Sequence, residues 1–73
     1  MRIVLTEHAR DRLSQRNIRE RDVIQTLKNP DRILKSFGRR KIAVKSIKEK
    51  TLEVVFREEK DILIIITSYW LEE

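Results

Sequence analysis

The chain has 73 residues, no cysteine and a formal net charge of +5, with 40% of its residues charged. A chain of this length forms a single domain over residues 1–73 with a thin core, so we expect a shallow groove rather than a deep cavity. The absence of cysteine excludes disulfides, thiolate zinc sites and cysteine nucleophiles.

The first predicted helix covers residues 7–16. Thr6 can accept a hydrogen bond from the first turn as the N-cap, and Asn17 tolerates the left-handed conformation that often follows a last turn. Residues 2–5, Arg-Ile-Val-Leu, precede this helix and can form a short strand. The predicted order is thus a short strand followed at once by a helix.

The second predicted helix covers residues 20–28 and ends before Pro30, the only proline. Val23, Ile24 and Leu27 give it a narrow apolar stripe, which indicates one face packed against a core. The link between the two helices is short, so we expect a helical hairpin or corner.

After the proline the apolar pattern alternates with a period of two, which predicts strands. Four strands are expected, over residues 31–37, 40–47, 51–58 and 61–69. The last is apolar on both faces, which predicts a central position in the sheet with Ile64 and Ile66 almost fully buried. The predicted fold class is α+β, with two N-terminal helices packed on one face of a four-stranded antiparallel sheet.

Positive charge is concentrated in the first part of the chain. Residues 1–41 carry a net charge of +7, whereas residues 42–73 carry a net charge of −2. This asymmetry indicates an anionic partner, either nucleic acid or an acidic protein. The alternative is a surface charged for solubility and heat stability, because abundant Lys, Arg and Glu with few Gly and Pro are also typical of a thermophile.

The candidate functional residues begin with the only histidine. His8, Arg12 and Arg16 recur at every fourth position, so they share one face of the first helix. A titratable imidazole and two guanidinium groups on one face suit a phosphate-binding site. Alternatively, His8 is a capping or packing residue and both arginines pair with nearby carboxylates.

The strands add further candidates. Lys45 and Arg57 can contribute positive charge to a nucleic-acid site, and Tyr69 can donate a proton or stack on a base. Alternatively, the two cations are ordinary strand surface charges, and Tyr69 and Trp70 complete a small core or an interface. The basic run over residues 39–41 is interpreted as a solvated turn.

The chain resembles a widespread set of small prokaryotic domains of unknown function. The residues that carry this resemblance are the T-E-H-A-R-x-R-L-x-x-R motif from Thr6 to Arg16, Ile18, Val23, Leu27, Asn29-Pro30 and Ile66-Thr67-Ser68-Tyr69. That set is similar to the RelE/ParE/BrnT-like toxins of toxin-antitoxin systems, which have helices followed by a four-stranded antiparallel sheet. The likeness spans nearly the whole chain.

The resemblance implies an RNA-binding, toxin-type ribonuclease that needs no cofactor and acts with or without the ribosome. Metal-free RNA cleavage needs a base, an acid and cations that stabilise the charged phosphorane. The expected catalytic residues are His8, Arg12 and Tyr69, and the expected RNA contacts are Arg12, Arg16, Lys45 and Arg57. The expected partners are RNA or the ribosome, an acidic antitoxin protein and, as an open alternative, a second copy of the chain. A non-catalytic basic binding module is the alternative function.

Metal and membrane binding are not expected. A single histidine and the lack of a spaced acidic cluster argue against a metal site. The longest apolar run, residues 62–66, is far too short to span a bilayer, and no signal-peptide pattern is present at the N-terminus. We therefore predict a cytoplasmic protein.

Overall fold

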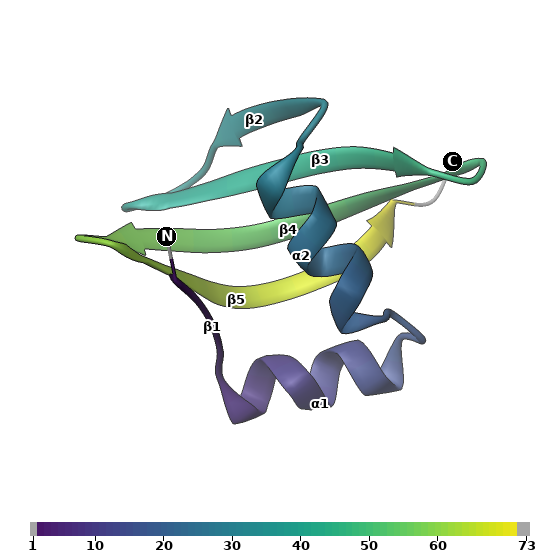
Figure 1. The fold of residues 1–73 in the computed structure, drawn as a ribbon, viewed down its shortest axis with the longest axis horizontal. Coiled ribbons are helices and arrows are strands. Elements are labelled where there is room, and N and C mark those ends of the chain that lie inside the picture. Colours follow the sequence, from purple (N-terminus) through teal and green to yellow (C-terminus); the bar gives the residue numbers. More distant parts are fainter. Residues whose placement is uncertain (1, 72–73) are drawn as a thin grey trace.

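The computed structural model describes residues 2–71, which form two helices and one five-stranded sheet (Figure 1). In chain order the elements are β1 (Arg2–Leu5), α1 (Glu7–Gln15), α2 (Glu20–Lys28), β2 (Arg32–Lys35), β3 (Arg40–Ile47), β4 (Lys50–Glu59) and β5 (Ile62–Leu71). The α+β class, the short N-terminal strand and both helices are confirmed. β2 is shorter than predicted, and β5 extends two residues further.

The sheet has the order β1-β5-β4-β3-β2, with antiparallel pairing throughout β2 to β5. β1 pairs in parallel with β5, from Arg2 opposite Ile62 to Leu5 opposite Ile65. The prediction of a four-stranded antiparallel sheet is therefore wrong in detail, because the sheet is mixed and has a fifth strand. The backbone of β5 needs hydrogen-bond partners on both sides, and β1 supplies those along its first half.

The local signals at the helix ends are confirmed. The Thr6 side chain accepts a hydrogen bond from the Ala9 amide at 3.1 Å, which satisfies one free donor of the first turn of α1. Asn17 follows the C-cap with a φ of 57°, the left-handed conformation that asparagine tolerates. These two residues fix where α1 begins and where the chain turns toward α2.

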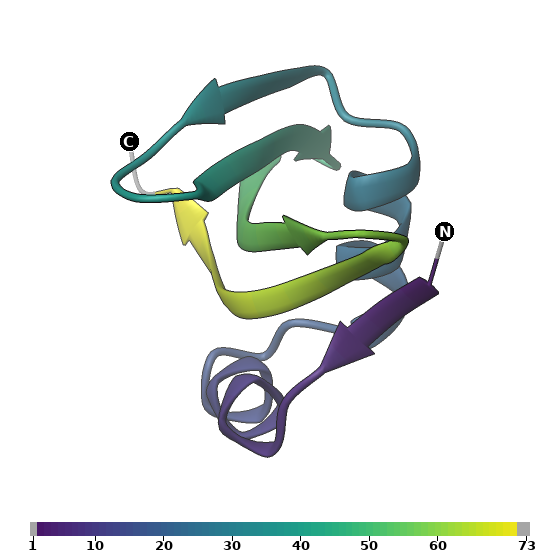
Figure 2. The same ribbon diagram turned by 90° about the vertical axis from the view of Figure 1, so that its left-hand side faces the viewer.

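One hydrophobic core joins both helices to the same face of the sheet. α2 packs against β3 and β4, whereas α1 packs along β5 beyond the end of β1 (Figure 1). The sheet curves strongly, and Figure 2 shows α1 almost end-on beside it. The buried core residues are Ala9, Leu13, Ile18, Val23, Ala43, Leu52, Val54, Phe56 and Ile65.

Side-chain burial along β5 differs from the prediction. Ile65 is fully buried against the helices, whereas Ile64 and Ile66 are only half-buried, so their expected burial is wrong. The register with β4 passes from Ile65 directly to Thr67 and leaves Ile66 as a bulged residue. Neither helix covers the opposite face of the sheet, so Ile64 keeps part of its surface in solvent. The central position of β5 between β1 and β4 is confirmed.

The buried face of α2 also differs from the predicted apolar stripe. Val23 and Thr26 are fully buried, whereas Ile24 and Leu27 are half-buried. Thr26 can be buried because its hydroxyl donates a 2.7 Å hydrogen bond to the carbonyl of Asp22, one turn earlier in the helix. Thr26 was not predicted as a core residue because the predicted stripe counts only apolar side chains.

Candidate nucleic-acid interface

His8, Arg12 and Arg16 share one face of α1, which we call the α1 stripe. Two of these side chains have no partner within the described residues. His8 and Arg12 are exposed, and within residues 2–71 neither makes a side-chain hydrogen bond or ion pair. Thr6 is the N-cap and His8 is exposed, so the capping and packing interpretation of His8 is wrong. The arginine of α1 that pairs with a carboxylate is Arg10, whose Nη1 lies 2.9 Å from Oε1 of Glu20.

Arg16, the last member of the stripe, is attached to the sheet. Its Nη1 donates hydrogen bonds to Oγ1 of Thr67 at 3.1 Å and to the carbonyl of Ser68 at 2.8 Å. This part of β5 lies beyond the end of β1, where the strand edge would otherwise be unpaired. Arg16 therefore positions α1 against β5 and is not a free phosphate ligand.

Tyr69 makes a hydrogen bond on the face of the sheet opposite the core. Its hydroxyl donates to Oε1 of Glu53 at 2.8 Å, and Glu53 is 9% exposed. Burial raises the pKa of Tyr69 above 10.0; the Glu53 carboxylate raises it further and the positive charge of Arg16 partly opposes the effect. Tyr69 is thus a neutral phenol at neutral pH whose proton is held by a carboxylate.

The predicted catalytic residues do not form one connected group. His8 and Arg16 are eight residues apart, which corresponds to about 12 Å along a helix axis. Tyr69 lies close enough to Arg16 for its charge to affect the phenol, and no hydrogen bond in residues 2–71 links Tyr69 to His8 or Arg12. Catalysis requires all three within reach of one phosphate, so their roles stay predictions.

Lys45 is engaged with the chain itself. Its Nζ donates to the carbonyl of Asn29 at 2.9 Å and lies 3.8 Å from Oδ1 of Asp31, with 17% of the side chain exposed. These contacts hold the link between α2 and β2 against β3.

Arg57 lies closer to the basic end of the sheet. Its Nη2 contacts Oε1 of Glu59 at 2.9 Å, whereas its buried Nε has no partner within residues 2–71. Arg57 is also directly opposite Arg40 in the β3–β4 register. Like charges at opposite positions destabilise a sheet, so an anion near this pair would be stabilising.

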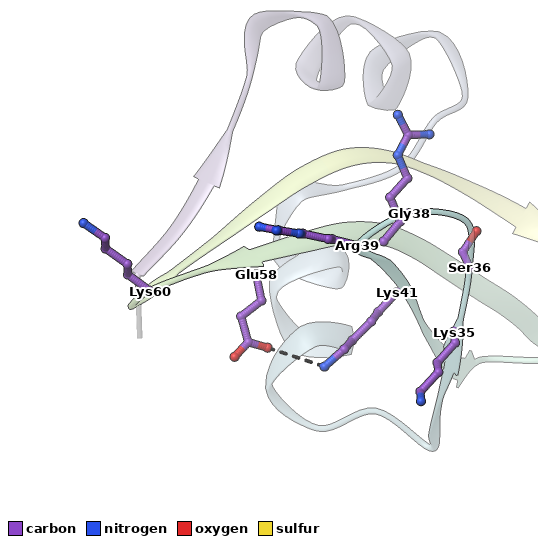
Figure 3. Close-up of a pocket in the computed structure, with 8 residues that line it drawn as sticks. Lys35, Ser36, Gly38, Arg39, Lys41, Glu58 and Lys60 are labelled. Atoms are coloured by element: carbon purple, nitrogen blue, oxygen red, sulfur yellow. Dashed lines mark ion pairs between the residues drawn. The ribbon is translucent and has the colours of Figure 1, made fainter.

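A strongly basic pocket occupies the end of the sheet where the β2–β3 loop and the β4–β5 turn lie together (Figure 3). We call it the hairpin pocket. Its volume is about 490 Å³. It is lined by Lys35, Ser36, Gly38, Arg39, Arg40, Lys41, Glu58 and Lys60.

The hairpin pocket has five cationic side chains and one carboxylate. That carboxylate, Glu58, lies 3.9 Å from Nζ of Lys41, and both side chains are more than two-fifths exposed. Figure 3 shows Lys41 reaching toward Glu58, whereas Lys60 extends outward from the β4–β5 turn. An exposed ion pair of this length neutralises little of the local field, so the pocket is an attractive site for anions.

Phe37 stands in the loop that forms this pocket and is 93% exposed. The loop turns at Gly38, whose φ of 66° is strained for other residues, although an added Cβ would meet open space. An aromatic ring beside clustered cations is the composition of single-stranded nucleic-acid sites, where bases stack on rings and phosphates contact cations.

Sequence patterns contain only partial signals for this pocket. The prediction of a solvated turn over the basic run 39–41 is correct for Arg39 alone, because Arg40 and Lys41 begin β3. Lys35 and Lys60 reach the same place only through strand pairing. An isolated phenylalanine in a short polar loop is the signal that could have identified the site. Phe37 stands between Ser36 and Gly38 and just before three basic residues.

Two further findings concern metal ions and membranes. Among residues 2–71, no group of three or more His, Asp or Glu side chains could hold a metal ion. No helix in that same range is both long and apolar enough to cross a membrane.

The structure thus defines a small α+β domain with two helices on one face of a mixed sheet and a basic pocket with an exposed aromatic ring at one end. A family model described as "Domain of unknown function (DUF4258)" matches residues 5–70, and the chain belongs to this family. Searches of curated proteins and of solved structures gave no match. The expected membership of a small domain family of unknown function is therefore confirmed.

Proposed function

We propose that this domain binds single-stranded RNA through the hairpin pocket. The observation that carries the proposal is the nearly complete exposure of Phe37 in a loop flanked by Lys35 and Arg39. Exposing a large apolar ring to water is unfavourable, and a stacked base would cover it. Bases are free to stack in this way only where they are not paired in a duplex.

The cations of the pocket supply the second half of the interaction. Arg39 and Lys60 are exposed and have no carboxylate partner within residues 2–71, so they can contact phosphates without breaking an existing ion pair. Arg40 and Arg57 face each other across two strands and gain from an anion between them. Phosphates and a base can therefore be bound together at one end of the sheet.

The relationship to RelE-like toxins belongs to this proposal as well. Two N-terminal helices followed by antiparallel strands agree with that fold, whereas the parallel β1 differs from the expected sheet. An acidic antitoxin would fit the same basic surface, and RNA or the ribosome as a ligand implies a cytoplasmic location. Ribonuclease activity stays a prediction, because no contact within residues 2–71 links His8 or Arg12 to Tyr69 and neither residue lines the hairpin pocket.

The test is the affinity of a short labelled single-stranded RNA, followed by fluorescence anisotropy at low salt. We expect Phe37→Ala to weaken binding by about 1–3 kcal/mol, or roughly 5- to 150-fold, through loss of one stacked base. The matched control is Ile33→Ala, which removes an exposed apolar side chain from the same hairpin without removing a ring. Its affinity should equal that of the wild type.

Arg39→Glu and Arg12→Glu separate the hairpin pocket from the α1 stripe. Both replacements lower the net charge equally, so a difference between them identifies the face that contacts RNA. We expect the larger loss for Arg39→Glu. A larger loss for Arg12→Glu, or no effect of Phe37→Ala, would contradict the proposed site, and inspection of the RNA for cleavage tests the enzymatic prediction in the same samples.

A further inference from the structure

A second groove is lined by residues of the α1–α2 link and of the β3–β4 turn. Figure 1 shows both segments at the end of the sheet opposite the β2–β3 loop. Two adjoining hollows of about 690 and 710 Å³ share Asn17, Arg19, Lys50 and Trp70. We call them together the Trp70 groove. Their size lies within the range of about 300–1,000 Å³ that is typical of small-molecule sites.

Trp70 gives this groove a fixed aromatic surface. The indole is half-buried and packs against the hydrophobic core, so its position is set, while part of it remains open to the groove. Nζ of Lys50 lies 5.5 Å from the centroid of the ring. An ammonium at this distance makes a cation–π interaction, and its flexible stem allows it to move aside when another group covers the ring.

The groove also has positive charge that no carboxylate pairs with. Arg19, Arg21, Lys48 and Lys50 line it, and none of these four forms an ion pair within the described chain. Arg16 also lines one of the two hollows but is hydrogen-bonded to β5. A phosphate entering the groove would therefore meet cations that lose no existing carboxylate partner.

The combination of groups favours a nucleotide over a simple anion. Phosphate or sulfate alone would need only the cations, whereas an anchored indole offers a flat face that suits a nucleobase. Asn17, Asp22 and Glu49 also line the groove and can accept hydrogen bonds from the amino groups of a base edge. The base and the phosphate thus each have suitable groups in the groove.

We propose that the Trp70 groove binds a nucleotide, with the base stacked on Trp70 and the phosphate held by Lys50 and its neighbouring cations. This site is separate from the hairpin pocket, because β3 places them about 25 Å apart at the usual rise of a strand. The nucleotide is either a free nucleoside monophosphate or one residue of an RNA strand. Both sources share the same base and phosphate chemistry.

Trp70 is the only tryptophan in the chain, so its fluorescence and its indole N–H resonance report on this groove alone. The experiment titrates the full chain with adenosine monophosphate, ribose 5-phosphate, inorganic phosphate and a short single-stranded RNA. We expect saturable quenching of Trp70 and a shift of the indole resonance with the nucleotide or with the RNA. A response to adenosine monophosphate would show that a free nucleotide is sufficient for binding. A response to the RNA but not to the mononucleotide would show that the ligand is part of an RNA strand.

Lys50→Glu should weaken this binding by about tenfold, the loss expected for one charge-assisted hydrogen bond. The matched control is Lys60→Glu in the hairpin pocket, which should leave the mononucleotide affinity unchanged. Phe37→Ala should also leave it unchanged, so failure at the hairpin pocket and failure here are distinguishable. No saturable change of Trp70 with any base-containing probe, an equal response to inorganic phosphate, or equal effects of Lys50→Glu and Lys60→Glu would overturn the proposal.

Discussion

Tyr69 shows how one neighbouring residue decides what a side chain can do. On its own the phenol could donate a proton or stack on a base, but here it donates to the buried Glu53 carboxylate. Glu53 as a residue is only 9% exposed, and a buried carboxylate needs a hydrogen-bond donor because burying it without a partner is costly. The phenol therefore stabilises Glu53 in the folded state, and its availability to a ligand is reduced.

This pair predicts a specific dependence of stability on pH. Because the folded-state pKa of Tyr69 is raised above 10.0, its contribution to the free energy of unfolding is complete below that pH and is lost as the pH rises through the folded-state pKa. Tyr69→Phe lacks the hydrogen bond to Glu53, so the wild type should be the more stable at neutral pH, and the difference should shrink as the phenol ionises in alkali. Urea denaturation of both proteins across this range is the measurement.

Tyr69 is the only tyrosine, so phenolate absorbance gives its titration directly. A midpoint at or below 10.0 in the folded protein, or a stability difference that does not change between neutral and alkaline pH, would contradict the assigned role of the Glu53 contact. The comparison with Tyr69→Phe cancels the titration of lysines, which both proteins share.

At the level of elements, the attachment of α1 depends on Arg16. The helix lies along β5 beyond the end of β1, and Arg16 bonds to Thr67 and to the carbonyl of Ser68 across this gap. We expect Arg16→Ala to lower the free energy of unfolding by about 1 kcal/mol, a value at the modest end for charged hydrogen bonds because the site is partly exposed.

The control for this prediction is Arg12→Ala, one turn earlier on the same helix face. Arg12 is exposed and has no partner within residues 2–71, so its loss should change stability by less than about 0.5 kcal/mol. Urea denaturation compares the two variants, and hydrogen exchange of α1 amides should increase for Arg16→Ala. Equal effects of both replacements would show that α1 is held by its apolar face alone.

Sequence patterns predicted those elements whose signals are local. Thr6 and Asn17 mark the ends of α1. The alternation of apolar and polar residues predicts β3, because successive side chains of a strand point to opposite faces of the sheet. The parallel pairing of β1 and the bulge at Ile66 were not predicted, since both depend on partners that are distant in the chain. The burial of Ile64 was wrong because an apolar pattern does not show which face the helices cover.

At the level of the whole molecule, strand pairing brings together charged residues that are far apart in the sequence. The basic half ends at residue 41, yet the hairpin pocket also takes Lys60 and Glu58 from the acidic half through the β3–β4 register. The two basic surfaces lie at opposite ends of the sheet, which a count along the chain cannot reveal. Candidate residues on α1 were predictable as a helical face, whereas the hairpin pocket required the tertiary structure.

This distribution of charge predicts the salt dependence of RNA binding. Each phosphate contact releases counterions, and for single strands the slope of log K against log salt is about −0.7 per contact. Four of the five pocket cations are free of the Glu58 contact, so the slope for wild type should be about −3 if each meets one phosphate. Titrations of the labelled RNA at several salt concentrations measure it.

Three variants test whether the salt dependence comes from contacts in the hairpin pocket or from the net charge of the protein. Arg39→Glu should make the slope shallower by about 0.7, because one phosphate contact is lost. Phe37→Ala should weaken binding at every salt concentration and leave the slope unchanged, because stacking on an uncharged ring releases no counterions. Arg12→Glu should alter neither the slope nor the stacking contribution, since α1 lies outside the pocket. A slope near zero for the wild type would exclude phosphate contacts as the source of affinity and would favour a protein partner that binds through apolar contacts.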